Sequence, residues 1–289
     1  MGPIARGDNQ KRMPVTSAEA RRKSLIVPRE HGAWGILLVP LVTGAAVGLL
    51  AGGRSLPLAP LVMAALALFW LRTPVENWVG TAPTRARTPG EVAAVRNASL
   101  ALGAVAVAAL AWLFWGGRNG ALLWIGAASA AAFVIQALVR AQWRTARTAA
   151  QTVGAAGLTA VAPAAYCTVT GALNSAAWAL WIANLLFAFN QIQYVHLRIQ
   201  AARAADTREK LAAGRGFLAG QIALIAILVA ACALGLFPWL PALAFLPLLI
   251  RGFTWFAARP KPLVIHALGR QELYHAIGFG VLLVLGFAA

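Results

Sequence analysis

Charged and polar side chains gather in four short segments of a chain that is otherwise mostly apolar. The first segment, "PREHGAW", places a cation, an anion and an imidazole side by side at Arg29, Glu30 and His31. A positioned carboxylate or imidazole can act as a general acid or base, and a guanidinium can bind a carboxylate or a phosphate through two parallel hydrogen bonds. Because an apolar stretch follows directly, we expect this segment at the edge of a membrane.

The second segment, "FWLRTPVENWVGTAPTRARTPGE", ends an apolar run. Arg72 and Glu76 are four residues apart and share a helix face, with Asn77 beside them. Arg85 and Arg87 follow in a Pro-containing loop. An ionised side chain deep in a bilayer costs about 2.5–3.5 kcal/mol, and Glu76 is well placed to offset this cost for Arg72. An Arg that extends to the membrane interface and pairs at a helix end would give the same pattern.

The third segment, "LFAFNQIQYVHLRIQ", carries a polar stripe along one side of a predicted helix. Asn190, Tyr194 and Arg198 follow each other at intervals of four residues, so they lie on one face. Gln193 lies beside this stripe, whereas Gln191 lies off it.

The fourth segment, "HALGRQELYHAIGFG", opens the last apolar run. Glu272 precedes His275 by three residues, and Gln271 precedes it by four. Four polar segments at one membrane face predict a polar cavity that opens to the cytoplasm; unrelated interfacial anchors are the alternative. In such a cavity we expect Glu30 to pair with a cation from another segment, and His31 to face the shared space.

The composition indicates a membrane protein. Hydrophobic residues make up 60% of the 289-residue chain and charged residues only 11%, whereas a soluble domain is normally about a quarter charged. Apolar runs of about 20 residues, long enough to cross the core of a bilayer, recur along the chain. They predict an all-α, polytopic membrane helix bundle with spans at about 33–52, 57–78, 92–115, 120–140, 150–172, 176–196, 216–235, 237–256 and 271–288.

The placement of the basic residues predicts the orientation of the chain. With the N-terminus in the cytoplasm, all Lys and Arg residues except Arg54 and Arg118 fall on the cytoplasmic side, as the positive-inside rule requires. The net charge of +17 therefore reflects topology and attraction to anionic lipid, and we expect no nucleic-acid partner. Residues 1–27 are predicted to form a polar cytoplasmic tail, disordered or lying on the surface, before a transmembrane helical domain at 28–289.

Proline, glycine and cysteine residues inside the spans point to packing. Pro40 and Pro163 each free a backbone carbonyl and are expected to kink their helices. The small-residue pattern from Gly44 to Gly48 lets helices approach closely, and we favour packing inside the chain over a dimer contact. The two cysteines lie in separate spans and give no metal-binding or redox spacing.

"PREHGAWGILLVP" resembles the opening of the YwiC-like family of bacterial integral membrane proteins. The stretch around Tyr194 and Arg198 and the last helix are similar as well, so the resemblance extends over about 26–289. It implies a multi-pass protein of the bacterial cytoplasmic (inner) membrane.

A more distant resemblance is to the UbiA prenyltransferase superfamily, whose members have nine spans and long loops after spans two and six. Here these loops are expected at about 80–91 and 197–215. In that superfamily, acidic motifs before the loops hold Mg²⁺ and the diphosphate of an isoprenoid donor. The corresponding positions hold Arg72, Thr73, Glu76 and Gly80 in the first motif, and Asn190, Gln191, Tyr194 and Arg198 in the second. A single carboxylate cannot form the two-site Mg²⁺–diphosphate clamp, so we expect no cofactor, and Mg²⁺ is the one ion that the resemblance leaves open.

Three functions remain open at this point. The first is binding of an amphipathic, isoprenoid- or quinone-like ligand in the polar cavity, without the usual Mg²⁺–diphosphate chemistry. The second is a UbiA-like transferase with Glu76, His31 or His275 as the acid–base group, and the third is a solute or proton-coupled transporter. A lipid or isoprenoid-like molecule is the expected partner, and the oligomeric state is open. The expected binding residues are Arg29, Glu30, Arg72, Asn77, Arg85, Arg87, Asn190, Gln193, Tyr194, Arg198 and Glu272.

Overall fold

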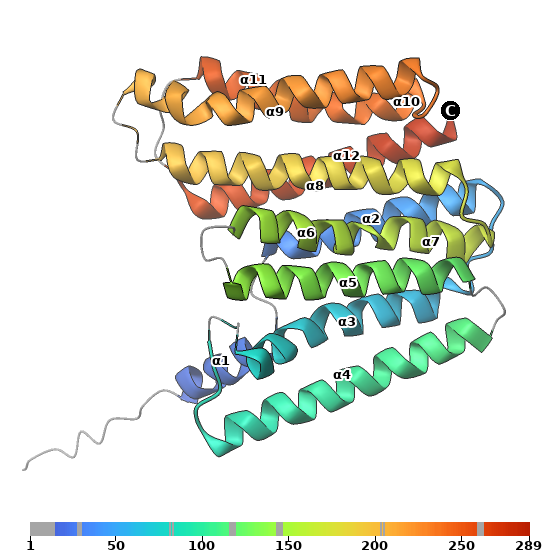
Figure 1. The fold of residues 1–289 in the computed structure, drawn as a ribbon, viewed down its shortest axis with the longest axis vertical. Helices are drawn as coiled ribbons and strands as arrows, with labels where there is room; N and C mark the ends of the chain where they lie inside the picture. Colours follow the sequence, from blue (N-terminus) through green and yellow to red (C-terminus); the bar gives the residue numbers. More distant parts are fainter. Residues whose placement is uncertain are drawn as a thin grey trace, which may run out of the picture.

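Long helices that alternate in direction make up the computed structural model of the protein (Figure 1). The structure describes residues 15–27, 31–80, 82, 84–115, 120–142, 147–202, 204, 206–258 and 263–289. In these residues the helices are α1 (Val15–Ile26), α2 (His31–Leu50), α3 (Leu58–Val79), α4 (Pro89–Trp115), α5 (Gly120–Gln142), α6 (Arg147–Thr159), α7 (Val161–Thr170), α8 (Ser175–Ala201), α9 (Thr207–Ala233), α10 (Trp239–Ala242), α11 (Leu246–Ala257) and α12 (Ile265–Ala288). A short 3-10 turn at Leu243–Phe245 connects α10 to α11.

The predicted all-α architecture with nine spans is confirmed. Within the described residues, 9 helical segments are long and apolar enough to cross a membrane: α2, α3, α4, α5, α6 with α7, α8, α9, α10 with α11, and α12. A helix satisfies its backbone hydrogen bonds internally, which is why apolar runs adopt this form in lipid. The protein is therefore an integral membrane protein built as a helix bundle.

One end of the bundle, which we call the Arg-rich end, is where α2 begins and where α3, α5, α8 and α11 terminate (left in Figure 1). Exposed tryptophans lie at both ends: Trp78 lies at the Arg-rich end of α3, and the opposite end holds Trp115, Trp124, Trp178 and Trp239. Tryptophan favours the boundary between lipid and water, so these side chains fit the two faces of a membrane.

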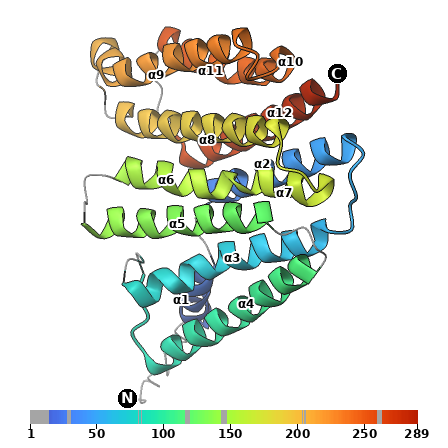
Figure 2. The ribbon, with the colours of Figure 1, turned by 45° about the vertical axis from the view of Figure 1, so that its right-hand side comes forward.

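Along the long axis of the molecule the helices follow a simple order. Figures 1 and 2 place α9 and α11 at one extreme, then α8 and α12, then α2, α6 and α7, then α5, and finally α3 and α4. The two-part span α6–α7 is the most buried of the described spans, whereas α4 and α5 leave most of their residues exposed for contact with lipid. The largest buried apolar cluster joins α2, α7, α8, α9 and α12.

The loop after the sixth span is shorter than the sequence predicted. The sequence placed it at 197–215, but α8 continues to Ala201 and α9 begins at Thr207. Asp206 caps the start of α9, because its Oδ1 accepts a hydrogen bond from the backbone N–H of Glu209 at 2.8 Å. Polar residues beyond the apolar run therefore extend both helices past the expected span ends.

Part of the polar N-terminal segment forms a helix that packs on the bundle. α1 contacts α3 and α4, and its Leu25 is completely buried. The backbone oxygen of Leu25 accepts a hydrogen bond from Asn77 Nδ2 on α3 at 3.5 Å. The tail predicted at 1–27 is thus a docked helix over its last part, whereas residues 1–14 lie outside the described residues.

Pro163 interrupts the fifth span, in line with its predicted effect. α6 ends at Thr159 and α7 begins at Val161. Pro163 has no N–H to donate to the carbonyl of Thr159, four residues earlier. α2 continues as one helix through Pro40, and the kink predicted there stays a prediction.

Glycine lets α2 and α7 approach closely. A Cβ on Gly44 would lie 2.1 Å from the backbone oxygen of Ala162, and a Cβ on Gly48 would lie 3.1 Å from the Cβ of Val169. The small-residue pattern therefore serves packing inside the chain, as the sequence analysis favoured.

Gly44→Ala is expected to lower the free energy of unfolding by about 1–3 kcal/mol, because the new methyl group overlaps the backbone of α7. Gly35→Ala in the same helix is the matched control, since no atom lies within 4 Å of a Cβ at that position. Heat or denaturant unfolding of the purified protein in mild detergent measures both variants. Equal stability of the two would contradict the close packing of α2 on α7.

Candidate functional site

A buried ion pair joins α11 to α12. Arg251 Nη1 donates to Glu272 Oε2 at 2.5 Å, and both side chains are only 8% exposed. Both residues lie inside helical segments that are apolar enough to cross a membrane. Ionisable residues in such helices are costly, and those that face the bundle interior commonly mark functional positions. This pair is the centre of the candidate site.

Helix α8 supplies the polar side chains around the ion pair. Arg251 Nη2 donates to Asn190 Oδ1 at 3.3 Å, and the guanidinium carbon lies 4.0 Å from the centre of the Tyr194 ring. Gln191 Nε2 donates to the backbone oxygen of Glu272 at 3.2 Å. The structure therefore brings together the third and fourth polar segments of the sequence and connects them through Arg251.

Several polar atoms in this region are enclosed by protein and have no hydrogen-bond partner among the described residues. They are Arg251 Nε, Glu272 Oε1, Gln191 Oε1 and both amide atoms of Gln221 on α9. Gln221 is 0% exposed, and its amide lies against Gly252, the neighbour of Arg251 in the chain. An unpaired buried polar group costs about 1–3 kcal/mol. A polar group that pairs with these atoms would remove this cost.

Two further cations lie near the Arg-rich ends of α8 and α9. Arg198 Nη1 donates to the Tyr194 hydroxyl at 3.3 Å. Lys210 is 3% exposed, and its Nζ donates to the backbone oxygens of Trp255, at 2.6 Å, and Ala258. Lys210 thereby satisfies carbonyl groups at the C-terminus of α11, a position that favours a cation.

A second polar group lies on α3 and α5. Glu76 Oε1 accepts hydrogen bonds from Arg72 Nε and from Arg140 Nη1, each at 3.0 Å. The predicted pairing of Arg72 with Glu76 is therefore present, and Arg140 joins it. Figures 1 and 2 place α3 and α8 on opposite sides of α5, α6 and α7 along the long axis. The second polar segment thus forms its own group, apart from the Arg251 site.

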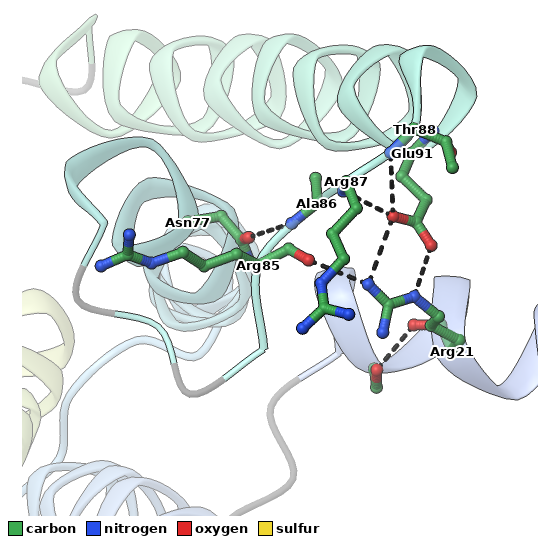
Figure 3. Close-up of polar contacts among 8 residues, drawn as sticks. Arg21, Asn77, Arg85, Ala86, Arg87, Thr88 and Glu91 are labelled. Atoms are coloured by element: carbon green, nitrogen blue, oxygen red, sulfur yellow. Dashed lines mark hydrogen bonds and ion pairs between the residues drawn. The ribbon is translucent and has the colours of Figure 1, made fainter.

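Figure 3 shows how the docked helix α1 is held in place. Arg21 Nε donates to Glu91 Oε1 at 2.6 Å, and Arg21 Nη2 donates to the backbone oxygen of Arg85 at 3.1 Å. The backbone N–H of Arg87 donates to Glu91 Oε2 at 2.7 Å. The hydrogen bond to Glu91 raises the pKa of Arg21 above its ordinary value. The side chains of Arg85 and Arg87 are exposed, so these residues join this contact through their backbones.

Other predicted site residues lie away from the buried ion pair. His275 Nδ1–H donates to the backbone oxygen of Gln271, one turn earlier in α12, at 2.7 Å. Asn77 connects α3 to the loop that follows, since its Oδ1 accepts from the backbone N–H of Ala86 at 3.2 Å. Gln193 is half-buried on α8.

Most of the first polar segment at 28–31 lies outside the described residues. Arg29 and Glu30 lie outside the described residues. His31 is the first residue of α2, and its side chain lies outside them as well. A cation partner for Glu30 and a cavity-facing His31 stay predictions.

Sequence reasoning missed the most important residues of the site. Arg251 was counted among the basic residues of the cytoplasmic side, although it lies six positions before the end of α11. An Arg so far inside an apolar run is itself a signal of a buried partner. Gln191 was set off the α8 stripe, and Gln221 and Arg140 attracted no notice, since a single glutamine or basic residue reveals no partner in the sequence.

One comparison with known proteins finds a family match over part of the chain. Residues 27–166 match the family model described as YwiC-like protein. This YwiC-like region includes the "PREHGAW" opening and reaches into α7. The resemblance expected around Tyr194 and in the last helix lies beyond the match and stays a prediction.

No curated protein and no solved structure matches the chain. The Arg251 site lies on helices that follow the YwiC-like region, so its role must be argued from its own chemistry. The same holds for the similarity to UbiA enzymes, which stays a prediction.

The described residues do not fit the Mg²⁺–diphosphate clamp that a UbiA-like enzyme would need. The Glu76 carboxylate is bound by two arginines, and that of Glu272 by Arg251. Among the described residues, no group of three His, Cys, Asp or Glu side chains is placed to hold a metal ion. A hard divalent cation binds through several such oxygens.

Arg251→Leu is expected to lower the free energy of unfolding by about 3–5 kcal/mol, because it leaves the Glu272 carboxylate buried without its partner. The double variant Arg251→Leu with Glu272→Leu should recover most of this loss. Arg270→Leu makes the same change at an exposed position of α12 and is the matched control. Unfolding in mild detergent measures all three, and a single variant as stable as the control would rule out a tightly coupled pair.

Glu91→Gln is expected to release α1 from the bundle, since it weakens the bonds to Arg21. A protease specific for lysine should then cut at the exposed Lys23 several-fold faster, because cleavage follows local opening. Arg87→Ala is the control, since the Arg87 contact with Glu91 uses its backbone N–H. An unchanged cleavage rate in Glu91→Gln would show that α1 is held by other contacts.

Proposed function

We propose that this integral membrane protein binds an amphipathic, isoprenoid- or quinone-like lipid in the Arg-rich half of its bundle. The polar head of the ligand lies at the Arg251–Glu272 pair, between α8, α11 and α12. The apolar tail lies along the apolar surfaces of the helices, and binding proceeds without the Mg²⁺–diphosphate chemistry of prenyltransferases.

The observation that carries this proposal is the set of enclosed polar atoms without a protein partner. Arg251, Glu272 and Gln191 each retain one atom with no hydrogen-bond partner among the described residues. Arg251 nevertheless bonds the Glu272 carboxylate at 2.5 Å, and Gln191 bonds the backbone oxygen of Glu272 at 3.2 Å. A polar network with unpaired members is less stable than an apolar core of the same volume. Its presence in an apolar bundle therefore supports a ligand whose polar group completes the network.

We also propose that the Arg-rich end faces the cytoplasm of a bacterial cell, in the cytoplasmic membrane. Basic residues are retained on the cytoplasmic side during insertion. Arg72, Arg140 and Arg198 lie near that end, whereas Arg54 lies in the connection from α2 to α3 at the opposite end. The head-group site is then reached from the cytoplasmic leaflet.

A solute or proton-coupled transporter is the second candidate. The burial of Arg251 and Glu272, each 8% exposed, favours it, because intramembrane ionisable residues also mark ion pathways. Proton or solute flux into proteoliposomes separates the two functions: a binding protein without transport produces no flux above that of empty vesicles.

A UbiA-like transferase is the remaining alternative. Its expected acid–base residue, Glu76, is engaged by Arg72 and Arg140. The contacts of Glu76 therefore support a structural role over proton transfer.

The proposal predicts a lipid that is recovered with the protein and depends on Gln191. Gln191→Leu keeps the approximate volume but removes the amide, and Gln271→Leu makes the same change at an exposed position next to Glu272. Each protein is purified in mild detergent, extracted and compared by lipid mass spectrometry. An isoprenoid or quinone-like lipid should be enriched with the wild type and Gln271→Leu and reduced about tenfold in Gln191→Leu, as expected for one lost buried hydrogen bond. Only bulk phospholipid in all three samples would contradict the proposal.

A further inference from the structure

We infer that the polar head at the Arg251 site is a small, uncharged group that both donates and accepts hydrogen bonds, namely a hydroxyl. This inference rests on the proposed function and specifies the ligand class: an isoprenoid alcohol or a quinol, in preference to an isoprenoid diphosphate or an oxidised quinone. It follows from the charge, the hydrogen-bonding inventory and the enclosure of the site.

The charges of Arg251 and Glu272 balance each other. The guanidinium of Arg251 is bound to the Glu272 carboxylate at 2.5 Å, and its other terminal nitrogen donates to Asn190. Its face lies 4.0 Å from the centre of the Tyr194 ring. Each terminal nitrogen of Arg251 thus already donates one hydrogen bond within the protein. The Arg251–Glu272 pair itself carries no net charge, so it offers a diphosphate no cation that lacks a counterion.

Among the described residues, two of the three atoms without a hydrogen-bond partner at this pair are acceptors. A head group that only accepts hydrogen bonds could not pair with them. Glu272 Oε1 and Gln191 Oε1 are acceptors, and Arg251 Nε–H is a donor. The assignment for Gln191 follows from its bond to the backbone oxygen of Glu272, which can only accept. A hydroxyl donates to one of the acceptors and accepts from Arg251 Nε–H. A phosphate oxygen or a quinone carbonyl accepts only, and would face these oxygens without a proton between them.

The same hydrogen-bonding argument applies to Gln221 on α9. Both of its amide atoms lack partners, and the side chain is 0% exposed. An amide offers one accepting oxygen and two donor hydrogens, so it too pairs with a group that does both. The amide lies against Gly252, where an added Cβ would come within 2.9 Å of its Cδ. The amide of Gln221 therefore packs closely against the backbone of α11 at this position.

The test compares three compounds that share one apolar tail: geranylgeraniol, its methyl ether and its diphosphate. Dissociation constants are measured on the full-length protein in lipid nanodiscs. The alcohol is expected to bind about tenfold more tightly than the ether, which cannot donate a hydrogen bond, and more tightly than the diphosphate. In Gln191→Met, which removes one acceptor, the preference for the alcohol over the ether should fall. Gln271→Met should retain it, and thermal unfolding of both variants shows that they are folded.

The outcomes separate the inference from the proposed function. Tighter binding of the diphosphate, or equal binding of alcohol and ether, would overturn the hydroxyl head while leaving an amphipathic ligand in place. An alcohol preference that is unchanged in Gln191→Met would overturn its assignment to this site. Binding of none of the three compounds, compared with empty nanodiscs, would overturn the proposed function and the inference together.

Discussion

The ion pair between Arg251 and Glu272 is the interaction on which the rest of the site depends. Two ionised groups inside apolar helices persist only because they lie 2.5 Å apart and are bound by further polar groups. This requirement explains why α8 presents Asn190, Gln191 and Tyr194 together on the side that faces α11 and α12. The pair thus determines how three helices pack at the Arg-rich end. Several enclosed polar atoms that lack a hydrogen-bond partner among the described residues also lie at this pair.

The remainder of the bundle obeys the ordinary rules of helix packing in lipid. Where helices must approach closely, small residues remove the obstacle, as at Gly44 beside Ala162. The missing donor at Pro163 coincides with the break between α6 and α7, whereas α2 continues through Pro40. Apolar side chains on α4 and α5 remain exposed and face lipid. Against this background, the enclosed polar side chains of α8, α9, α11 and α12 stand out as the part of the molecule that packing does not require.

Two other polar groups at the same end of the bundle differ from the Arg251 group. Glu76, with Arg72 and Arg140, connects α3 to α5, and Glu91, with Arg21, holds α1 against the start of α4. In both, the carboxylate is engaged by cations from a neighbouring helix, which is a means of fixing helices at a membrane boundary. The Arg251 group differs, because Arg251 Nε, Glu272 Oε1 and Gln191 Oε1 retain hydrogen-bonding capacity. This difference supports structural roles for the first two groups and the proposed ligand binding for the third.

The sequence by itself determined that the protein lies in a membrane, and it determined the fold class and the approximate spans. Apolar runs of bilayer length have one stable form in lipid, the helix. The sequence also determined the Arg72–Glu76 pair, since residues four apart on a helix are neighbours. Only the tertiary structure decided which segments meet. Arg251 joins Asn190 and Glu272 across 61 and 21 positions of sequence, and no local spacing encodes such a contact. The docking of α1 on Glu91, 70 positions from Arg21, is of the same kind, because partners on different helices are chosen by the packing of the whole bundle.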